Sequence, residues 1–209
     1  QNRAHNDSII VNGDIRAGNY DDTLSGGYES RILFETGLGD DRVELNGQVT
    51  LGKQGVFDVH MGDGDDYLAI GGGISLGDGS RMSVYMGEGD DVIRMNGKVD
   101  LGFYMEDGNL HSRGELYMDA GAGNDLLILE APDAATFNEW YKDWLQTGNT
   151  FDHLSVENVV VQGVSDLSEI SWLSDLVYAN TNANLQLRGD ESSFSIINNY
   201  AAQLQVGVG

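Results

Sequence analysis

A five-residue turn with the pattern Gly-x-Gly-Asp-Asp recurs along the 209-residue chain and constrains its fold more than any other feature. Four copies begin at Gly37, Gly62, Gly87 and Gly121, and in the last copy Asn124 replaces the first aspartate. The steps between them are 25, 25 and 34 residues (62−37, 87−62 and 121−87). A fixed period of this size is typical of solenoids, in which each repeat stacks on its neighbours.

The same period extends beyond the turn. Asn-Gly or Gly-Gly pairs begin at residues 46, 71 and 96, and Leu-Gly pairs at residues 51, 76 and 101. A further copy lies 34 residues upstream, where Arg3 and His5 replace the two turn glycines and Asp7 keeps the second acid. The two longer steps predict extra residues at one corner only, as surface loops at 19–30 and 103–114.

Between these turns, apolar and polar residues alternate with a period of two, which predicts strands. Three short strands fit into each repeat, because each repeat has three turns. One repeat shows the pattern with these apolar positions: Val43 and Leu45, Val49 and Leu51, then Phe57, Val59 and Met61. We therefore predict an all-β fold for residues 1–131, a right-handed parallel β-solenoid of four to five coils. Each coil would contain three strands and follow the repeat of about 25 residues.

The pattern ends at Pro132, and residues 132–209 are predicted to form an α+β capping and export-associated region. Aromatic residues at Phe137, Trp140, Tyr141 and Trp144 follow helical spacing and predict an amphipathic helix over 137–145. A second helix is predicted over 166–177, and short strands over 154–162, 184–188 and 193–197. An open solenoid end exposes strand edges and apolar residues, so the helix at 137–145 is expected to cover it.

The charge is strongly acidic, with 34 Asp and Glu against 11 Lys and Arg and a net charge of −23. Nucleic acids and anionic membranes attract basic surfaces, so we expect neither as a partner. No apolar run is long enough to predict a membrane span. The absence of cysteine excludes disulfides and thiolate metal sites. Because the sequence begins with Gln1, we expect a monomeric fragment of a longer polypeptide.

Stacking at about 4.8 Å per coil would bring the acidic turns together in a ladder. Carboxylates at that spacing must take up protons or hold cations, unless they are merely solvated turn formers. Calcium suits such a set, because it takes six to eight oxygen ligands in flexible geometry, whereas zinc prefers His or Cys. The predicted ligands are Asp7, Asp41, Asp66, Asp91 and Asp125 in one column, with Asp40, Asp65, Asp90 and Asn124 beside it.

Four segments, 36–44, 61–69, 86–94 and 120–128, resemble the G-G-x-G-x-D-x-U-x calcium repeat of RTX proteins. The resemblance implies a parallel β-roll, calcium between successive turns and export through a type I secretion channel. It also implies that the second aspartate of each turn is a ligand and that the turn glycines contribute carbonyls. These glycines are Gly37, Gly39, Gly62, Gly64, Gly87, Gly89, Gly121 and Gly123. Because the turn occurs once per coil, we expect one calcium-bearing corner with up to four sites.

The predicted function is a calcium-stabilised structural or adhesive module of a large secreted bacterial protein, without catalytic residues. It would fold on calcium binding outside the cell, in the medium or at the cell surface, where a surface or glycan ligand is a further possible partner. The alternative is a carbohydrate-acting enzyme or a glycan-binding module on a β-helix. Its acid–base candidates occupy outward strand positions: Glu44, His60, Tyr85, Asp100 and Asp119.

Overall fold

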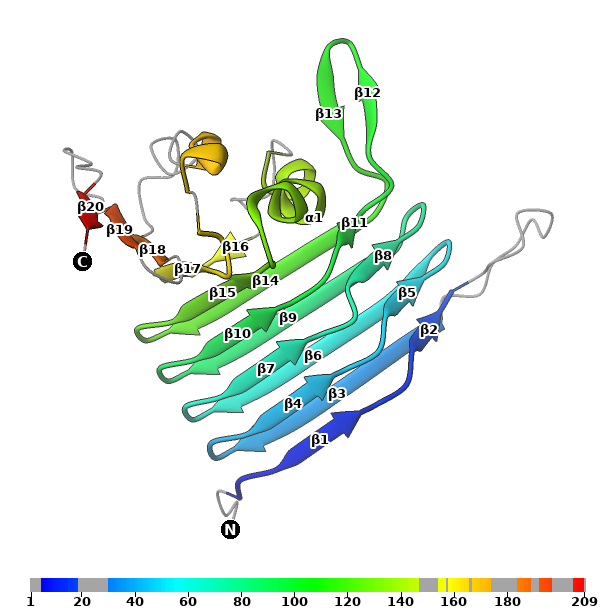
Figure 1. Cartoon of the computed structure of the whole chain (residues 1–209). Helices are drawn as coiled ribbons and strands as arrows, with labels where there is room; N and C mark the ends of the chain where they lie inside the picture. Colours follow the sequence, from blue (N-terminus) through cyan, green and yellow to red (C-terminus); the bar gives the residue numbers. More distant parts are fainter. Residues whose placement is uncertain are drawn as a thin grey trace.

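A computed structural model describes residues 5–18, 30–146, 154–156, 158–165, 167–173, 184–188, 192–196 and 205–208. Within these residues the chain forms three stacks of short parallel strands, which we call faces 1, 2 and 3 (Figure 1). The chain visits face 3, face 1 and face 2 in turn and then returns to face 3 one strand further along. The predicted stacking of parallel strands is therefore confirmed, and the architecture is that of a parallel β-solenoid.

The strands of each face lie in chain order. Face 1 contains β1 (Ser8–Val11), β4 (Arg42–Leu45), β7 (Tyr67–Ile70), β10 (Val92–Met95), β15 (Leu126–Glu130) and β17 (Asn158–Gln162). Face 2 contains β2 (Ile15–Ala17), β5 (Val49–Leu51), β8 (Ile74–Leu76) and β11 (Val99–Asp100). Face 3 contains β3 (Ser30–Leu38), β6 (Gly55–Asp63), β9 (Arg81–Glu88), β14 (Glu115–Ala122) and β16 (Leu154–Ser155).

The register of these strands follows the sequence period. On face 1, Val43 pairs with Leu68 and Leu68 with Ile93, and Ile93 then pairs with Leu127. These steps equal the ones that separate the aspartates of the corresponding acidic turns. The extra residues of the longest step are therefore accommodated outside the strands, and equivalent side chains stack on one another along the whole described array.

Alternation of apolar residues places one side of most of the stacked strands in a continuous core. Val43, Phe57, Leu68 and Met82 are completely buried, and each pairs with another core residue of the next strand. Burying such side chains contributes about 1.5–3 kcal/mol each relative to exposure. No single coil could enclose these residues, so the stacking itself creates the core.

The predicted loop at 103–114 contains a hairpin that projects from the stack (Figure 1). Strands β12 (Tyr104–Glu106) and β13 (Asn109–His111) pair antiparallel. They are joined by Asp107 and Gly108, whose φ angles of 50° and 81° are those of a two-residue turn with left-handed residues. The other predicted loop, at 19–30, lies outside the described residues except for Ser30, which begins β3.

Helix α1 (Ala134–Gln146) includes the predicted span of 137–145 and begins three residues earlier. Asp133 precedes it and accepts the Thr136 N–H at Oδ1 (2.7 Å), which also lowers the pKa of Asp133. Phe137, Tyr141 and Trp144 are buried. The Tyr141 hydroxyl lies 3.0 Å and 2.9 Å from the carbonyl oxygens of Met95 and Glu130, so this helix is linked to β10 and β15.

The other predictions for the C-terminal region agree with the structure only in part. The region 154–162, predicted to contain strand, has two strands that lie on different faces, β16 and β17. Within the helix predicted over 166–177, residues Leu167–Ile170 form a 3-10 helix and residues 172–173 are α-helical, while 166 and 174–177 lie outside the described residues. The other predicted strands correspond to β18 (Asn184–Arg188) and β19 (Ser192–Ile196), with β20 (Gln205–Val208) beyond them. Strand β18 extends face 1 in parallel, and β19 and β20 continue it antiparallel.

Candidate functional site

The acidic turns join face 3 to face 1 and stack on one another, forming what we call the acidic corner. Its second aspartates make an inner column linked by backbone hydrogen bonds. The Asp7 N–H donates to Asp41 Oδ1 (2.6 Å), the Asp41 N–H to Asp66 Oδ1 (2.7 Å), the Asp66 N–H to Asp91 Oδ1 (2.7 Å), and the Asp91 N–H to Asp125 Oδ1 (2.9 Å). The predicted alignment of these five residues in one column is what the structure has.

The first acids of the turns make an outer column, whose hydrogen bonds run in the opposite direction. The Asp65 N–H donates to Asp40 Oδ1 (3.1 Å), the Asp90 N–H to Asp65 Oδ1 (2.9 Å), and the Asn124 N–H to Asp90 Oδ1 (2.9 Å). Each outer carboxylate therefore accepts from the following coil, whereas each inner carboxylate accepts from the preceding one. Two parallel ladders with opposite polarity connect the coils at this corner.

The two columns differ sharply in burial. Asp41, Asp66 and Asp91 are at most 2% exposed, whereas the residues of the outer column are exposed to solvent. Among the described residues, the Oδ2 atoms of these three buried aspartates have no hydrogen-bond partner. An ionised carboxylate in such a place costs several kcal/mol unless a cation or a proton neutralises it.

Burial in the inner column raises the pKa of two of its carboxyl groups. Burial raises the pKa of Asp66 from 3.8 to about 7, against the lowering effect of the Asp41 N–H, and the neighbouring carboxylates raise it further. Burial likewise raises the pKa of Asp91. Both shifts have the same physical cause, which is removal from water of a charge that has only one hydrogen bond.

The turn glycines are favoured by positive φ angles or by close stacking, and a Cβ atom would meet another coil at all of them except Gly37. Positive φ angles between 94° and 142° occur at Gly37, Gly39, Gly62, Gly64, Gly87, Gly89 and Gly121. A Cβ atom at Gly62 would lie 1.7 Å from the Gly37 carbonyl oxygen, so adjacent turns pack backbone to backbone. The Gly64 N–H donates to the Glu88 carbonyl of the following turn (2.8 Å). Gly123 shares the close packing, since its Cβ would lie 1.7 Å from the Gly89 carbonyl oxygen.

The acid–base candidates do not converge on one place. His60, Tyr85 and Asp119 form one outward column on face 3, where the rings of His60 and Tyr85 lie 4.8 Å apart. Glu44 lies on face 1 and Asp100 on face 2. The five candidates are therefore distributed over three faces.

Two polar residues in the neighbouring column of face 3 are buried, although their outward positions favour exposure. Asp58 and Ser83 pair with each other in the register and are 2% and 1% exposed. Arg31 forms an ion pair with Asp58 at 2.8 Å, and its own side chain remains 60% exposed. The alternating sequence pattern predicts that these two side chains point outward. It does not predict that neighbouring residues bury them.

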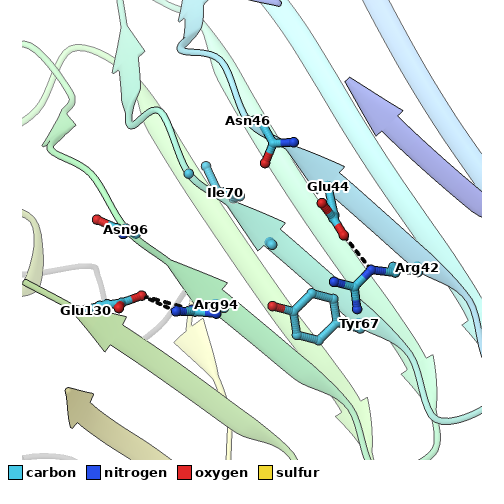
Figure 2. A pocket seen from close by; sticks show the side chains of 10 residues that line it. Arg42, Glu44, Asn46, Tyr67, Ile70, Arg94, Asn96 and Glu130 are labelled. Atoms are coloured by element: carbon cyan, nitrogen blue, oxygen red, sulfur yellow. Dashed lines mark hydrogen bonds and ion pairs between the residues drawn. The ribbon is translucent and has the colours of Figure 1, made fainter. Parts of the chain in front are cut away.

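A second feature lies on the outer surface of face 1 and was not predicted from the sequence. It is a depression of about 200 Å³ lined by residues of β4, β7, β10 and β15 (Figure 2). Two ion pairs, Arg42 with Glu44 and Arg94 with Glu130, lie around it. We call this depression the hollow. The sequence feature that corresponds to the hollow is a pair of small residues, Ala69 and Gly71, which stack between longer side chains of the neighbouring coils. This feature is recognisable only once the stacking is known.

Over the described residues, no three His, Cys, Asp or Glu side chains converge on a single point that could hold a metal ion. Within the same residues, no helix combines the length and apolarity needed to cross a membrane. Comparison of the chain with family models, with curated proteins and with solved structures gave no match.

Proposed function

We propose that this chain is a calcium-stabilised structural or adhesive module of a secreted bacterial protein. The observation that carries the proposal is the inner column at the acidic corner. Apart from the exposed Asp7, its aspartates are buried and stacked coil upon coil. At Asp41, Asp66 and Asp91, each carboxylate has an oxygen without a hydrogen-bond partner among the described residues. Such a column needs positive charge to stay ionised at neutral pH, and extracellular calcium is a suitable source.

The donor types suit a hard cation. The residues that would hold calcium are the inner aspartates through Oδ2, with the outer carboxylates Asp40, Asp65 and Asp90 and the side chain of Asn124 beside them. Carboxylates alone do not complete a set of six to eight oxygens, so backbone carbonyls and water would supply the remainder. The turn carbonyls implied by the RTX resemblance would have to serve two roles, because they also pack against the next coil.

The proposal extends to the finer architecture. We infer right-handed coils whose length is the distance in sequence between paired residues such as Val43 and Leu68, with the longer steps absorbed at one corner. We also infer that the C-terminal region caps the stack. The burial of Phe137 and Trp144 and the hydrogen bonds from Tyr141 to β10 and β15 support this role for α1.

Calcium-dependent stacking suggests how such a module could operate. At the low calcium level inside a cell, repulsion along the inner column would weaken the stack, and the chain would remain suited to passage through a secretion channel. At the millimolar calcium level outside, binding to the native state would stabilise it by mass action. The folded product would be a stiff, highly charged segment within a larger secreted protein.

The decisive experiment is a calcium titration of chelator-treated protein at pH 7.5. We expect circular dichroism to show a gain of strand content or a rise in melting temperature, and calorimetry to give saturable binding of up to four ions. Magnesium, which demands stricter octahedral geometry, should produce a smaller effect at equal concentration. Unchanged strand content and melting temperature at millimolar calcium would overturn the proposal.

A further inference from the structure

The hollow on face 1 has a floor of small residues between walls of long ones. Ala69 on β7 pairs with Glu44 on β4 and with Arg94 on β10, so the shortest side chain of this row lies between two of the longest. Gly71 follows two residues later, just past the end of the same strand, and has no side chain. The long neighbours therefore border an open depression of about 200 Å³.

The walls of the hollow are charged but neutral in sum. Arg42 Nε donates to Glu44 Oε1 on one side. On the other side, Arg94 donates to Glu130 Oε2 from both Nε (2.9 Å) and Nη2 (2.6 Å). Two cations and two anions cancel, which is unusual on a chain with a net charge of −23. Because each guanidinium already has a carboxylate partner, an anionic ligand would have to compete with that partner.

Polar and aromatic groups complete the rim. The Arg42 guanidinium lies 4.3 Å from the centroid of the Tyr67 ring, which fixes both groups at one end of the hollow. Asn46 and Asn96 lie toward the other end, as Figure 2 shows, where Asn46 Nδ2 already donates to Asn12 Oδ1. The hollow thus presents hydrogen-bond donors and acceptors in close alternation, next to one aromatic ring.

We infer that the hollow binds one neutral sugar unit of a glycan. Neighbouring hydroxyls of a pyranose both donate and accept hydrogen bonds, which matches the paired Arg–Glu groups and the amides of the hollow. The volume lies below the range of about 300–1,000 Å³ for drug-sized ligands, which favours a single ring. The open sheet surface on either side leaves room for the chain to continue. This inference is independent of calcium at the acidic corner.

The test is saturation-transfer NMR followed by calorimetry on the whole chain in millimolar calcium. The probes are neutral oligosaccharides of β-1,4-linked glucose, α-1,4-linked glucose, β-1,4-linked xylose and β-1,4-linked N-acetylglucosamine, with oligogalacturonate as the anionic comparison. We expect saturable binding of at least one neutral probe. Binding of oligogalacturonate alone, or of no neutral probe, would overturn the inference.

The variant Gly71→Gln fills the hollow with little strain. A Cβ atom at position 71 would lie 3.7 Å from its nearest neighbours, which is ordinary contact, and the φ angle of Gly71 is not positive. We expect at least a tenfold loss of affinity for the neutral probe. The matched control is Ser75→Gln, an outward position of face 2, which should bind as the parent chain does. Equal binding by Gly71→Gln and the parent chain would overturn the site assignment.

A second variant tests the charge balance and does not depend on Gly71. Glu130→Gln leaves the Arg94 guanidinium without its carboxylate partner. We expect the affinity for the neutral probe to fall and that for oligogalacturonate to rise, each by about threefold or more. If this variant kept the parent chain's ratio of affinities for the neutral probe and oligogalacturonate, the paired charges would have no role in the choice of ligand.

Discussion

Two corners of the solenoid stack equivalent polar side chains coil upon coil, but the hydrogen-bonding groups of these side chains find different partners. At the acidic corner, the inner aspartates accept backbone N–H groups through Oδ1. At the corner between faces 1 and 2, which we call the amide corner, Asn46 Nδ2 donates to Asn12 Oδ1 at 3.0 Å. An amide carries donors and an acceptor, so stacked amides satisfy one another, whereas an ionised carboxylate only accepts. Stacked carboxylates therefore need something from outside the chain.

Both corners bring backbones of neighbouring coils close together, but individual glycines differ in how much room they leave for a side chain. In the copy of the repeat that begins at Gly62, the amide corner has Gly71 in place of asparagine, and a Cβ atom there would make ordinary contacts at 3.7 Å. At the acidic corner, a Cβ on Gly62 would overlap the Gly37 carbonyl oxygen. Gly47 and Gly72 at the amide corner are also tightly packed, since a Cβ atom there would lie 2.3 Å and 2.2 Å from backbone atoms of the neighbouring coil. Burial of charge, rather than backbone packing, therefore separates the two corners. The following predictions test that contrast.

The largest effect is expected from alanine at the tight turn. Gly62→Ala places a side chain at φ 118° and against a backbone oxygen, which should cost more than about 3 kcal/mol or prevent folding. Gly71→Ala at the amide corner should change the free energy of unfolding by less than about 1 kcal/mol. Urea unfolding of both variants in calcium provides the measurement. Similar losses for the two would contradict the difference in packing between positions 62 and 71.

Neutralising one buried aspartate should have the next largest effect, with a sign that depends on calcium. In chelator, Asp66→Asn should stabilise the fold by about 1–3 kcal/mol, because it removes a buried charge and retains the oxygen that accepts the Asp41 N–H. In calcium, the same variant should show a smaller ion-induced rise in melting temperature than the parent chain. The control is Asp65→Asn in the exposed outer column, which should shift the stability in chelator by less than about 0.5 kcal/mol.

The buried column also predicts an unusual pH dependence for the calcium-free protein. The pKa of Asp66 is about 7 in the folded chain, against an ordinary value of 3.8. Between these values the folded state binds a proton that the unfolded state lacks, so the stability should rise as pH falls from about 7 toward 3.8. Thermal melts in chelator across this window would detect the rise. Calcium should flatten the profile, and Asp66→Asn should weaken it even without calcium.

The smallest effect is expected at the amide corner. Asn46→Ala removes the hydrogen bond to Asn12 at an exposed place, so the loss should be about 0.5–1 kcal/mol. Because no charge is uncovered, the loss should be equal in calcium and in chelator, and equal at pH 5 and pH 7. A calcium-dependent loss at this position would show that the two corners are coupled.

Much of the fold could be predicted because the chain repeats. The period locates equivalent residues such as Asp41, Asp66 and Asp91, and stacking of equivalent strands places them in one column. The aromatic spacing likewise located α1. The split of 154–162 into β16 and β17 could not be predicted, since no repeat covers it and the two pieces pair with different faces. The hairpin at 104–111 was predicted only as a loop.

For the candidate site, the sequence by itself determined which carboxylates align, because alignment follows from a period shared by strands and turns. Only the tertiary structure decided what the alignment does to them. Burial of the inner column, the opposite polarity of the two ladders and the Oδ2 atoms without partners all depend on contacts between coils. The same holds for the hollow, because its depth comes from side chains on different coils, such as Glu44 and Glu130, which are far apart in sequence. Such relationships exist only once the stack has formed.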